Sequence, residues 1–222
     1  KQLALSPCAQ TLQAFFVLLM QLPQDEKKQA LKRLIQNARE QSDDNVATFI
    51  LRLHQYYPDD IGLFAALFLH CLTLQPGEAM FLSPGTLHAY VHGVAVEVMA
   101  SSDNVLRAGL TPKKINLTEL VACTVFEPVD GEQLRMRPLS ESGRYHYPVP
   151  VEDFCFDVFS NVSDIAMQTA SAEIILVIDG QALLQHHSGE TVTLHTGQSV
   201  FIPAVTGDWM LSITGTLCRV YG

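Results

Sequence analysis

Between residues 72 and 114 the chain alternates short β-prone runs with turn residues, and this pattern limits most strongly the folds that the chain can adopt. The first turn is Gln75-Pro76-Gly77-Glu78, in which proline fixes φ and glycine supplies a left-handed position. Two alternating runs, 87–91 and 94–98, flank the dipeptide His92-Gly93, which predicts a tight hairpin. The sequence therefore predicts β structure from residue 72 to about residue 126.

The two-residue loop of this hairpin also predicts which side chains face one another. His88 is then opposite Glu97, and directly opposed residues share a face, with Cβ atoms about 4.5–5.5 Å apart. A histidine and a carboxylate are thus expected to point into one space.

A basic cluster follows the predicted hairpin. After a loop at 101–104, the chain presents Arg107, Lys113 and Lys114 with no acidic residue among them. The whole chain has a net charge of −9, which argues against nucleic acid or an anionic membrane surface as a partner. A local basic cluster in an acidic chain is a candidate site for a small anion.

The N-terminal part carries helical patterns. Apolar residues recur at helical period within residues 7–57. We expect a first helix entered at Ser6-Pro7, a second opened by Pro23, and a third capped by Asp43-Asp44. A short apolar helix is expected at 61–69, and these stripes are interpreted as the packing faces of a helical subdomain.

The C-terminal part again has a β pattern. Residues 128–150 are polar and contain proline, and we expect them to form a surface connection. Beyond residue 151, Asp179-Gly180 and Thr214-Gly215 each separate two β-prone runs and predict hairpins. Many short strands with frequent turns are typical of a sandwich or jelly roll. PGEAMFLSPGTLHAY and HTGQSVFIPAVTGDW share a weak pattern, which indicates two similar barrels.

Composition indicates a folded chain in a reducing compartment. Of the 222 residues, 48% are hydrophobic and 17% are charged, which excludes a disordered chain. The five cysteines are odd in number and contain no Cys-x-x-Cys pair, as expected in the cytoplasm. The apolar run at 14–20 is too short to span a bilayer and lacks signal-peptide flanks. The chain begins with Lys1, so we expect further sequence upstream.

Three segments together carry a resemblance to a known family. PGEAMFL, then HAY, then VEVMASSDNVLRAGLTPK resemble the signature block of the type I mannose-6-phosphate isomerases, also called phosphomannose isomerases, which are zinc-dependent cupins. The resemblance implies a mainly β chain with two cupin-type jelly-roll barrels, the first incomplete, preceded by an α-helical segment. The expected domains are a helical subdomain at 1–70, part of a catalytic barrel at 71–127, the connection at 128–150 and a second barrel at 151–222.

The resemblance also implies roles for particular residues. It implies that His88 binds zinc, and that Glu97 is either a catalytic or ligating carboxylate near the metal or a partner that orients His88. Arg107 matches an active-site arginine that can stabilise an enediolate-like transition state, although the residue alone fits a surface charge equally well. Lys113 matches a phosphate-contacting lysine. The remaining pocket residues, expected to bind substrate, are Tyr90 and Asp103.

The implied activity is the zinc-dependent, reversible isomerisation of mannose 6-phosphate and fructose 6-phosphate, a step of mannose metabolism in the cytoplasm. A base must move a proton between C1 and C2, and the choice between Glu97 and a zinc-bound water stays open. The alternatives are a non-enzymatic cupin module, sugar-binding or regulatory, that lacks the metal site, and another sugar-phosphate enzyme on the same scaffold.

The chain departs from the family in its metal ligands. In the family, a glutamine, a histidine and a glutamate from the N-terminal half hold zinc together with the histidine that His88 matches. Residues 1–71 contain no such Gln-x-His and glutamate set. Gln185-His186-His187 imitates the pair, but downstream, and we expect these histidines and His195 to be surface residues. The chain therefore resembles the C-terminal portion of an enzyme whose partner is the missing N-terminal half, and alone it is expected to be inactive.

Overall fold

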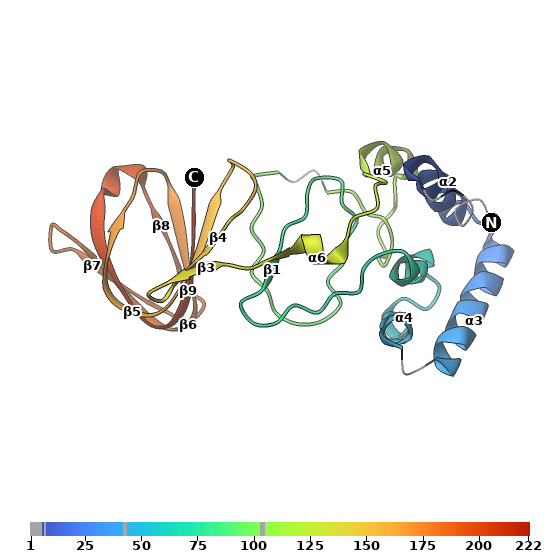
Figure 1. Cartoon of the computed structure of the whole chain (residues 1–222), viewed down its shortest axis with the longest axis horizontal. Coiled ribbons are helices and arrows are strands. Elements are labelled where there is room, and N and C mark those ends of the chain that lie inside the picture. The colour runs from blue at the N-terminus through green and yellow to red at the C-terminus, as the bar shows by residue number, and fades with distance from the viewer. Residues whose placement is uncertain (1–5, 7, 42–43, 103–104) are drawn as a thin grey trace. The chain divides into compact units, whose positions relative to one another are not determined.

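The computed structural model describes residues 6, 8–41, 44–102 and 105–222. The chain divides into two compact units, each assembled from separate pieces of sequence. The first unit comprises residues 1–74, 82–95 and 102–134, and the second comprises residues 75–81, 96–101 and 135–222. The α-helices belong to the first unit, and the strands of the described residues belong to the second (Figure 1).

Four helical elements open the first unit, as the periodic stripes predicted. They are α2 (Ala9–Met20), α3 (Gln24–Glu40), α4 (Asn45–Tyr56) and the 3₁₀ helix η1 (Ile61–Leu67). Asp44 caps α4 by accepting a hydrogen bond from the Val46 amide at 3.0 Å. The predicted start of the first helix is corrected, because α2 begins after Cys8. Pro7 and Asp43 lie outside the described residues.

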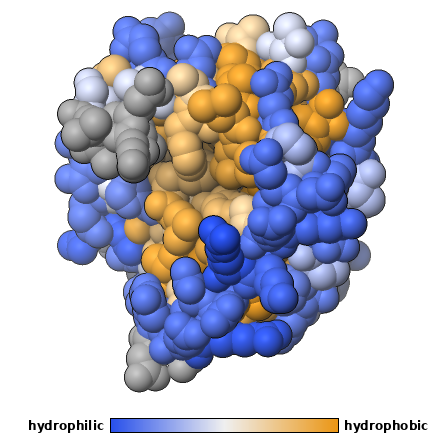
Figure 2. Space-filling view, turned by 90° about the vertical axis from the view of Figure 1, so that its right-hand side faces the viewer, coloured by the Kyte–Doolittle hydropathy of each residue, from blue (hydrophilic) through white to orange (hydrophobic). Residues whose placement is uncertain are grey.

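The core of the helical segment is formed by the predicted apolar stripes. Its buried side chains come from α3, α4 and η1, and they are Leu31, Leu34, Ile35, Ala38, Ala47, Ile50, Leu63 and Ala66. Apolar residues are also exposed: Leu18 is 64% and Leu67 is 57% accessible. On the face drawn in Figure 2, an apolar stretch lies between hydrophilic margins.

A helix replaces predicted β structure near residue 120. Residues Leu117–Cys123 form α5, and a short helix, α6 (Gly131–Leu134), follows. The Asn116 side chain accepts a hydrogen bond from the Glu119 amide at 3.4 Å and thereby caps α5. The run Asn-Leu-Thr-Glu is an N-terminal helix signal, so the prediction of β structure up to residue 126 was wrong here.

The second unit is built around one antiparallel seven-stranded sheet. Its strands follow the order β3-β4-β5-β9-β6-β7, and β8 pairs with β6. A separate two-stranded sheet joins β1 (Ala79–Met80) to β2 (Arg135–Met136). The bounds of the large sheet are β3 (Leu139–Glu141), β4 (Arg144–Tyr147), β5 (Cys155–Gln168), β6 (Glu173–His186), β7 (Thr191–His195), β8 (Ser199–Ile202) and β9 (Asp208–Tyr221), with a 3₁₀ turn, η2 (Ala204–Thr206), before β9.

The segment expected to be a surface connection contributes to this sheet. Within 128–150, strands β3 and β4 form a hairpin in which Glu141 pairs with Arg144. The two loop residues, Ser142 and Gly143, have φ values of 47° and 84°, which is the geometry of a tight hairpin turn. A side chain at Gly143 would lie 2.6 Å from Val162 Cγ1, so the turn also needs glycine for close packing.

The two glycine dipeptides of the C-terminal part do not form hairpins. β6 and β9 are continuous strands of 14 residues each, and Gly180 pairs directly with Gly215 between them. A Cβ atom on Gly180 would lie 1.8 Å from the Thr214 carbonyl oxygen, and one on Gly215 would lie 2.2 Å from that of Asp179. The register also shifts here, so both dipeptides mark a bulge where two bent strands approach closely.

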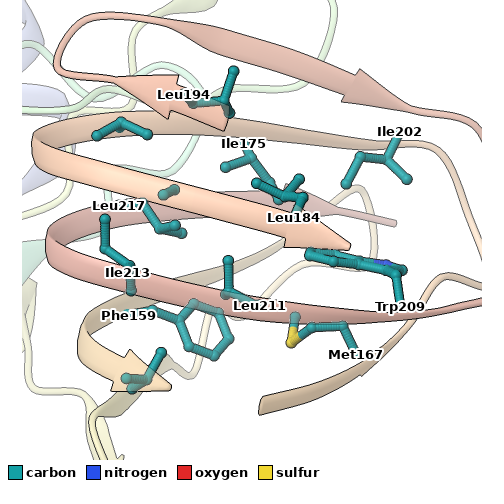
Figure 3. Close-up of a cluster of buried hydrophobic side chains, with 13 residues drawn as sticks. Phe159, Met167, Ile175, Leu184, Leu194, Ile202, Trp209, Leu211, Ile213 and Leu217 are labelled. Atoms are coloured by element: carbon teal, nitrogen blue, oxygen red, sulfur yellow. The ribbon is translucent and has the colours of Figure 1, made fainter. Parts of the chain in front are cut away.

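The sheet encloses an apolar core (Figure 3). Side chains from β5, β6, β7, β8 and β9 converge, and Phe159, Ile175, Leu211 and Leu217 are at most 1% exposed. Trp209 is 4% exposed, and its indole Nε1 donates to the Thr169 hydroxyl at 2.8 Å. The sheet thus forms a filled jelly-roll core, in agreement with the predicted C-terminal cupin-type barrel.

A charged network is buried beside this core. Glu173 and Arg219 form a buried ion pair, in which Nε of Arg219 lies 2.6 Å from Oε2 of Glu173. Asp157, which is fully buried, accepts from Arg144 Nη2 and from His146 Nδ1 at 2.8 Å each. Burial alone would lower the pKa of the Arg144 guanidinium. The hydrogen bonds and the charge of Asp157 have the larger effect, so the pKa is raised.

The length and hydropathy of a helix decide whether it could cross a membrane. Among the described residues, no helix combines the length and the apolar character that crossing a bilayer requires.

Candidate functional site

The segment that carries His88 begins with a turn that a glycine makes possible. The Thr86 amide donates to the Ser83 carbonyl at 3.1 Å, which closes the turn Ser83-Pro84-Gly85. Gly85 has a φ of 82°, and its carbonyl accepts from the Val125 amide at 3.1 Å. A Cβ atom at this position would lie 2.5 Å from the Cys123 carbonyl oxygen. The segment is therefore held close against the end of α5.

The imidazole of His88 is oriented by the backbone of its own turn. Nδ1 lies 2.9 Å from the Thr86 carbonyl oxygen, and a carbonyl can only accept, so Nδ1 carries the proton. In the neutral tautomer with this proton, Nε2 holds the lone pair through which histidine binds a metal. The His88 ring meets Tyr90 edge to face at 5.8 Å, and both side chains are exposed.

The predicted hairpin that would pair His88 with Glu97 does not form. Residues 87–98 contain no strand, so the register across His92-Gly93 is not observed. A strand is stable when its backbone groups pair with a neighbour, and none of the described residues supplies a strand beside this segment. The valines expected in the core are accordingly accessible, with Val94 fully exposed and Val96 43% exposed.

The other predicted residues are distributed over the two units. Arg107 and Lys113 are exposed side chains of the same compact unit as His88 and Tyr90. Glu97 is exposed and belongs to the second unit. The predicted pocket residue Asp103 lies outside the described residues.

The start of the signature block is fastened by three contacts within the second unit. Glu78 Oε2 lies 2.9 Å from Arg135 Nη1 and accepts from the Gln75 amide at the same distance. The Tyr147 hydroxyl donates to the Gly77 carbonyl at 2.9 Å. Burial raises the pKa of Tyr147, with a smaller contribution from Tyr145, so its hydroxyl remains a donor. The turn that the sequence predicted is therefore anchored to β2 and β4.

The histidines considered for a second metal site have structural partners. His186 Nε2 donates to the Thr206 carbonyl at 3.0 Å, and Nδ1 accepts from the Ser188 amide at 3.3 Å. Both ring nitrogens of a neutral imidazole are thus engaged. His187 Nδ1 donates to the Asp208 carbonyl at 3.3 Å, and His195 is exposed. A cavity of about 600 Å³ beside His186 and His187 contains none of the predicted site residues.

Metal-binding side chains are not grouped in the part of the chain that the structure describes. No three histidine, cysteine, aspartate or glutamate residues lie close enough there to hold an ion. His88 fits a metal through its free Nε2, but it is a single donor, and a catalytic zinc site normally has three protein ligands.

Two residues that hold the site were missed by sequence reasoning. The Thr86 carbonyl fixes the His88 ring, but a backbone contact has no sequence signal of its own. The side chain of Asp60, directly before η1, accepts a hydrogen bond from the Thr111 amide at 3.3 Å. The Asx-type spacing of Asp60 and Gly62 signals the cap, whereas the contact with Thr111 joins residues far apart in sequence.

Two family models match the chain. Residues 2–69 match the helical insertion domain of type I phosphomannose isomerase, and residues 144–222 match the cupin domain of mannose-6-phosphate isomerase. Together they cover most of the chain, including the helical segment and the large sheet.

Similar proteins of known function share these parts. The mannose-6-phosphate isomerase of Salmonella typhimurium is 42% identical over 220 residues, which cover 97% of this chain and 55% of that protein. The Escherichia coli protein of the same name is 40% identical over 218 residues, with the same coverage. The human protein of that name is 36% identical over 210 residues, 88% of this chain and 50% of that one. The chain thus spans about half the length of the curated relatives it matches.

Solved structures show the same relationship. The Salmonella typhimurium mannose 6-phosphate isomerase bound to its substrate and a zinc atom superposes with a TM-score of 0.87 at 38% identity. The match covers all of this chain and 56% of that one. An apo form of the same protein gives the same TM-score over 57% of its chain.

Proposed function

This chain belongs to the type I phosphomannose isomerase family, and from that premise we propose that the whole protein interconverts mannose 6-phosphate and fructose 6-phosphate. The relatives from Salmonella typhimurium and Escherichia coli are named mannose-6-phosphate isomerases. The chain described here contributes the helical insertion, the C-terminal cupin domain and part of the active site.

The observation that supports this proposal most strongly is the hydrogen bond that orients the His88 ring. Its Nδ1 proton is bound by the Thr86 carbonyl at 2.9 Å, which leaves Nε2 as a ready metal ligand. The metal we propose is zinc, since a similar structure contains zinc together with its substrate. When bound, zinc polarises the carbonyl and hydroxyl oxygens of the sugar as a Lewis acid.

The isomerisation needs a base and a stabiliser of negative charge. We assign the proton transfer between C1 and C2 to the Glu97 carboxylate and the stabilisation of the enediolate-like transition state to the Arg107 guanidinium. Three solved Salmonella typhimurium variants each have one residue changed to alanine, a histidine, a glutamate or an arginine, and the spacing of these positions equals that of His88, Glu97 and Arg107.

The phosphate group needs a separate cationic site. We assign it to Lys113, an exposed cation in an otherwise acidic chain. Tyr90, which lies edge to face with His88, and Asp103 are assigned to the walls of the sugar pocket. Phosphate binding supplies energy that positions C1 and C2 against the catalytic groups.

The remaining zinc ligands are proposed to come from the part of the relatives' length that this chain does not match. The same part would supply strand partners for residues 87–98, where Val94 is fully exposed. We also propose a cytoplasmic location, because all five cysteines are free thiols, as is usual in a reducing compartment.

The test compares the full-length protein with residues 1–222 alone. Zinc content is measured by elemental analysis, and fructose 6-phosphate formation from mannose 6-phosphate is followed by a coupled assay. We expect zinc and turnover in the full-length protein and neither in the shorter chain. A full-length protein that folds and binds sugar phosphate, but has neither zinc nor turnover, would instead support a non-enzymatic cupin module.

Single substitutions in the full-length protein separate the two cationic roles. Lys113→Ala should raise KM about 10- to 100-fold, the effect of losing one hydrogen bond to a charged group, with little change in kcat. Arg107→Ala should lower kcat by about 100- to 1,000-fold, as for other transition-state donors. Lys28→Ala, an exposed change on α3, is the control. The opposite pattern would exchange the two assignments.

A further inference from the structure

The loop that carries Arg107 and Lys113 is attached to the helical segment through one carboxylate. Asp60 Oδ1 accepts from the Gly62 amide at 2.7 Å and so caps η1. Its other oxygen, Oδ2, accepts from the Thr111 amide at 3.3 Å. A single half-buried side chain therefore joins η1 to the loop, and all of these residues belong to the same compact unit.

Two glycines allow the loop and η1 to touch through their backbones. A Cβ atom on Gly62 would lie 2.9 Å from the Leu110 amide nitrogen, and one on Gly109 would lie 3.0 Å from the Gly62 Cα. A side chain at Gly62 would force the backbone to shift, and one at Gly109 would make an unusually tight contact. The contact leaves the loop very little freedom to shift along η1.

The loop also adopts a backbone conformation that needs outside support. Leu110 has a φ of 51°, a left-handed conformation that is unfavourable for a residue with a branched side chain. Its side chain packs against the apolar core formed by α3, α4 and η1. Immediately after it, the Lys113 amide donates to the Thr111 hydroxyl at 3.2 Å. The Asp60 contact and the helical core together fix the backbone from which Lys113 projects.

We propose that Asp60 is a positioning residue for the phosphate site, and that one task of the helical segment is to hold the backbone at Thr111–Lys113 in its binding conformation. This inference rests on the proposed function, because it takes the ligand of Lys113 to be the phosphate of the substrate. Asp60 itself is an anion and does not contact the phosphate. It acts through the Thr111 amide and the backbone of Lys113.

The test uses Asp60→Asn in the full-length protein. An asparagine can accept one of the two hydrogen bonds through its single amide oxygen, but its amide nitrogen cannot accept the other. KM for mannose 6-phosphate should rise about five- to tenfold, and the inhibition constant for inorganic phosphate should rise by the same factor. The value of kcat and the zinc content should stay within twofold of the wild type.

The matched control is Asp59→Asn. Asp59 is adjacent and exposed, and the structure shows no hydrogen bond or ion pair for it with any described residue. Asp59→Asn should leave both constants unchanged. Gly62→Ala, which drives a Cβ atom into the Leu110 amide, should weaken phosphate binding at least as strongly as Asp60→Asn.

Two results would overturn the inference. One is an Asp60→Asn protein with the same KM and phosphate inhibition as Asp59→Asn. The other is a protein with a lower melting temperature but unchanged KM, which would mean that Asp60 serves stability alone. If the wild-type full-length protein does not isomerise mannose 6-phosphate, the proposed function fails instead. Calorimetric titration with inorganic phosphate would then still decide the role of Asp60.

Discussion

The buried ion pair of Glu173 and Arg219 is the interaction whose loss should most destabilise the cupin domain. Glu173 is 1% and Arg219 is 7% exposed, and two guanidinium nitrogens contact the carboxylate. The guanidinium also donates to the Gln168 carbonyl at 3.2 Å and lies 4.2 Å above the Tyr221 ring. Removing the cation would leave the buried Glu173 carboxylate without its two hydrogen bonds from Arg219.

We therefore expect Arg219→Met to lower the free energy of unfolding by about 3–5 kcal/mol, the usual cost of breaking a buried pair from one side. Methionine keeps most of the apolar stem, so little packing is lost. With a urea dependence of about 1–3 kcal/mol per M, the unfolding midpoint should fall by about 1–5 M. The double variant Glu173→Leu/Arg219→Met removes both charges and should recover much of the loss.

The assay follows the fluorescence of the full-length protein during a urea titration. Trp209 is the only tryptophan of this chain and is buried in the same domain, so its emission reports local unfolding in residues 1–222. Any tryptophan elsewhere in the full-length protein is replaced by phenylalanine beforehand. Arg137→Met, at an exposed arginine, is the control. A loss below about 1 kcal/mol for Arg219→Met, the level of an exposed pair, would refute the reasoning, as would a double variant less stable than the single one.

Three further predictions concern individual side chains. Thr169→Val removes the acceptor of the buried Trp209 indole and should cost about 1–3 kcal/mol in the same urea assay. The Thr11 hydroxyl lowers the pKa of the exposed Cys8 thiol, so iodoacetamide should modify Cys8 before the exposed Cys123, and Thr11→Val should remove this lead. Burial raises the pKa values of Tyr147 and Tyr221 above the ordinary 10.0. The folded state then retains protons that the unfolded state loses, so the contribution of these two tyrosines to stability should be fully present below pH 10.0 and be lost as the pH rises above it, as phenolate absorbance and urea midpoints would show.

The helical segment was predictable because its signals are local. The stripe that includes Leu31, Leu34 and Ile35 is buried as its period required, and the cap at Asp44 lies within two residues of its partner. A helix satisfies its hydrogen bonds within its own sequence. Periodicity therefore identifies both the element and its buried face.

The glycine dipeptides were misread for the opposite reason. Asp179-Gly180 has the local chemistry of a hairpin turn, and Gly180 does have a positive φ. Whether such a residue reverses the chain or bends it depends on the strand opposite, which is β9 at Gly215. That partner is remote in sequence, so the turn signal alone could not distinguish a hairpin from a bulge.

The same distinction between local signals and contacts remote in sequence applies to the candidate site. The residue types that could do the chemistry, such as His88, Arg107 and Lys113, stand out in the sequence by type and spacing. The groups that orient them do not, because one is the Thr86 backbone and the other, Asp60, acts on a residue 51 positions away. The predicted pairing of His88 with Glu97 failed because a strand needs a partner, and none is present among the described residues.

The short pairing of β1 with β2 has a consequence for how the protein is made. It closes a long loop that contains His88, Arg107 and Lys113, and the Tyr147 and Arg135 contacts secure the same junction. Chains leave the ribosome from the N-terminus at roughly 5–20 residues per second, so β1 must wait for its partner while the signature block is already synthesised. A nascent chain stalled before residue 135 would hold the proposed site residues in a loop without its closing strand. Residues translated after the signature block thus close the loop that contains it.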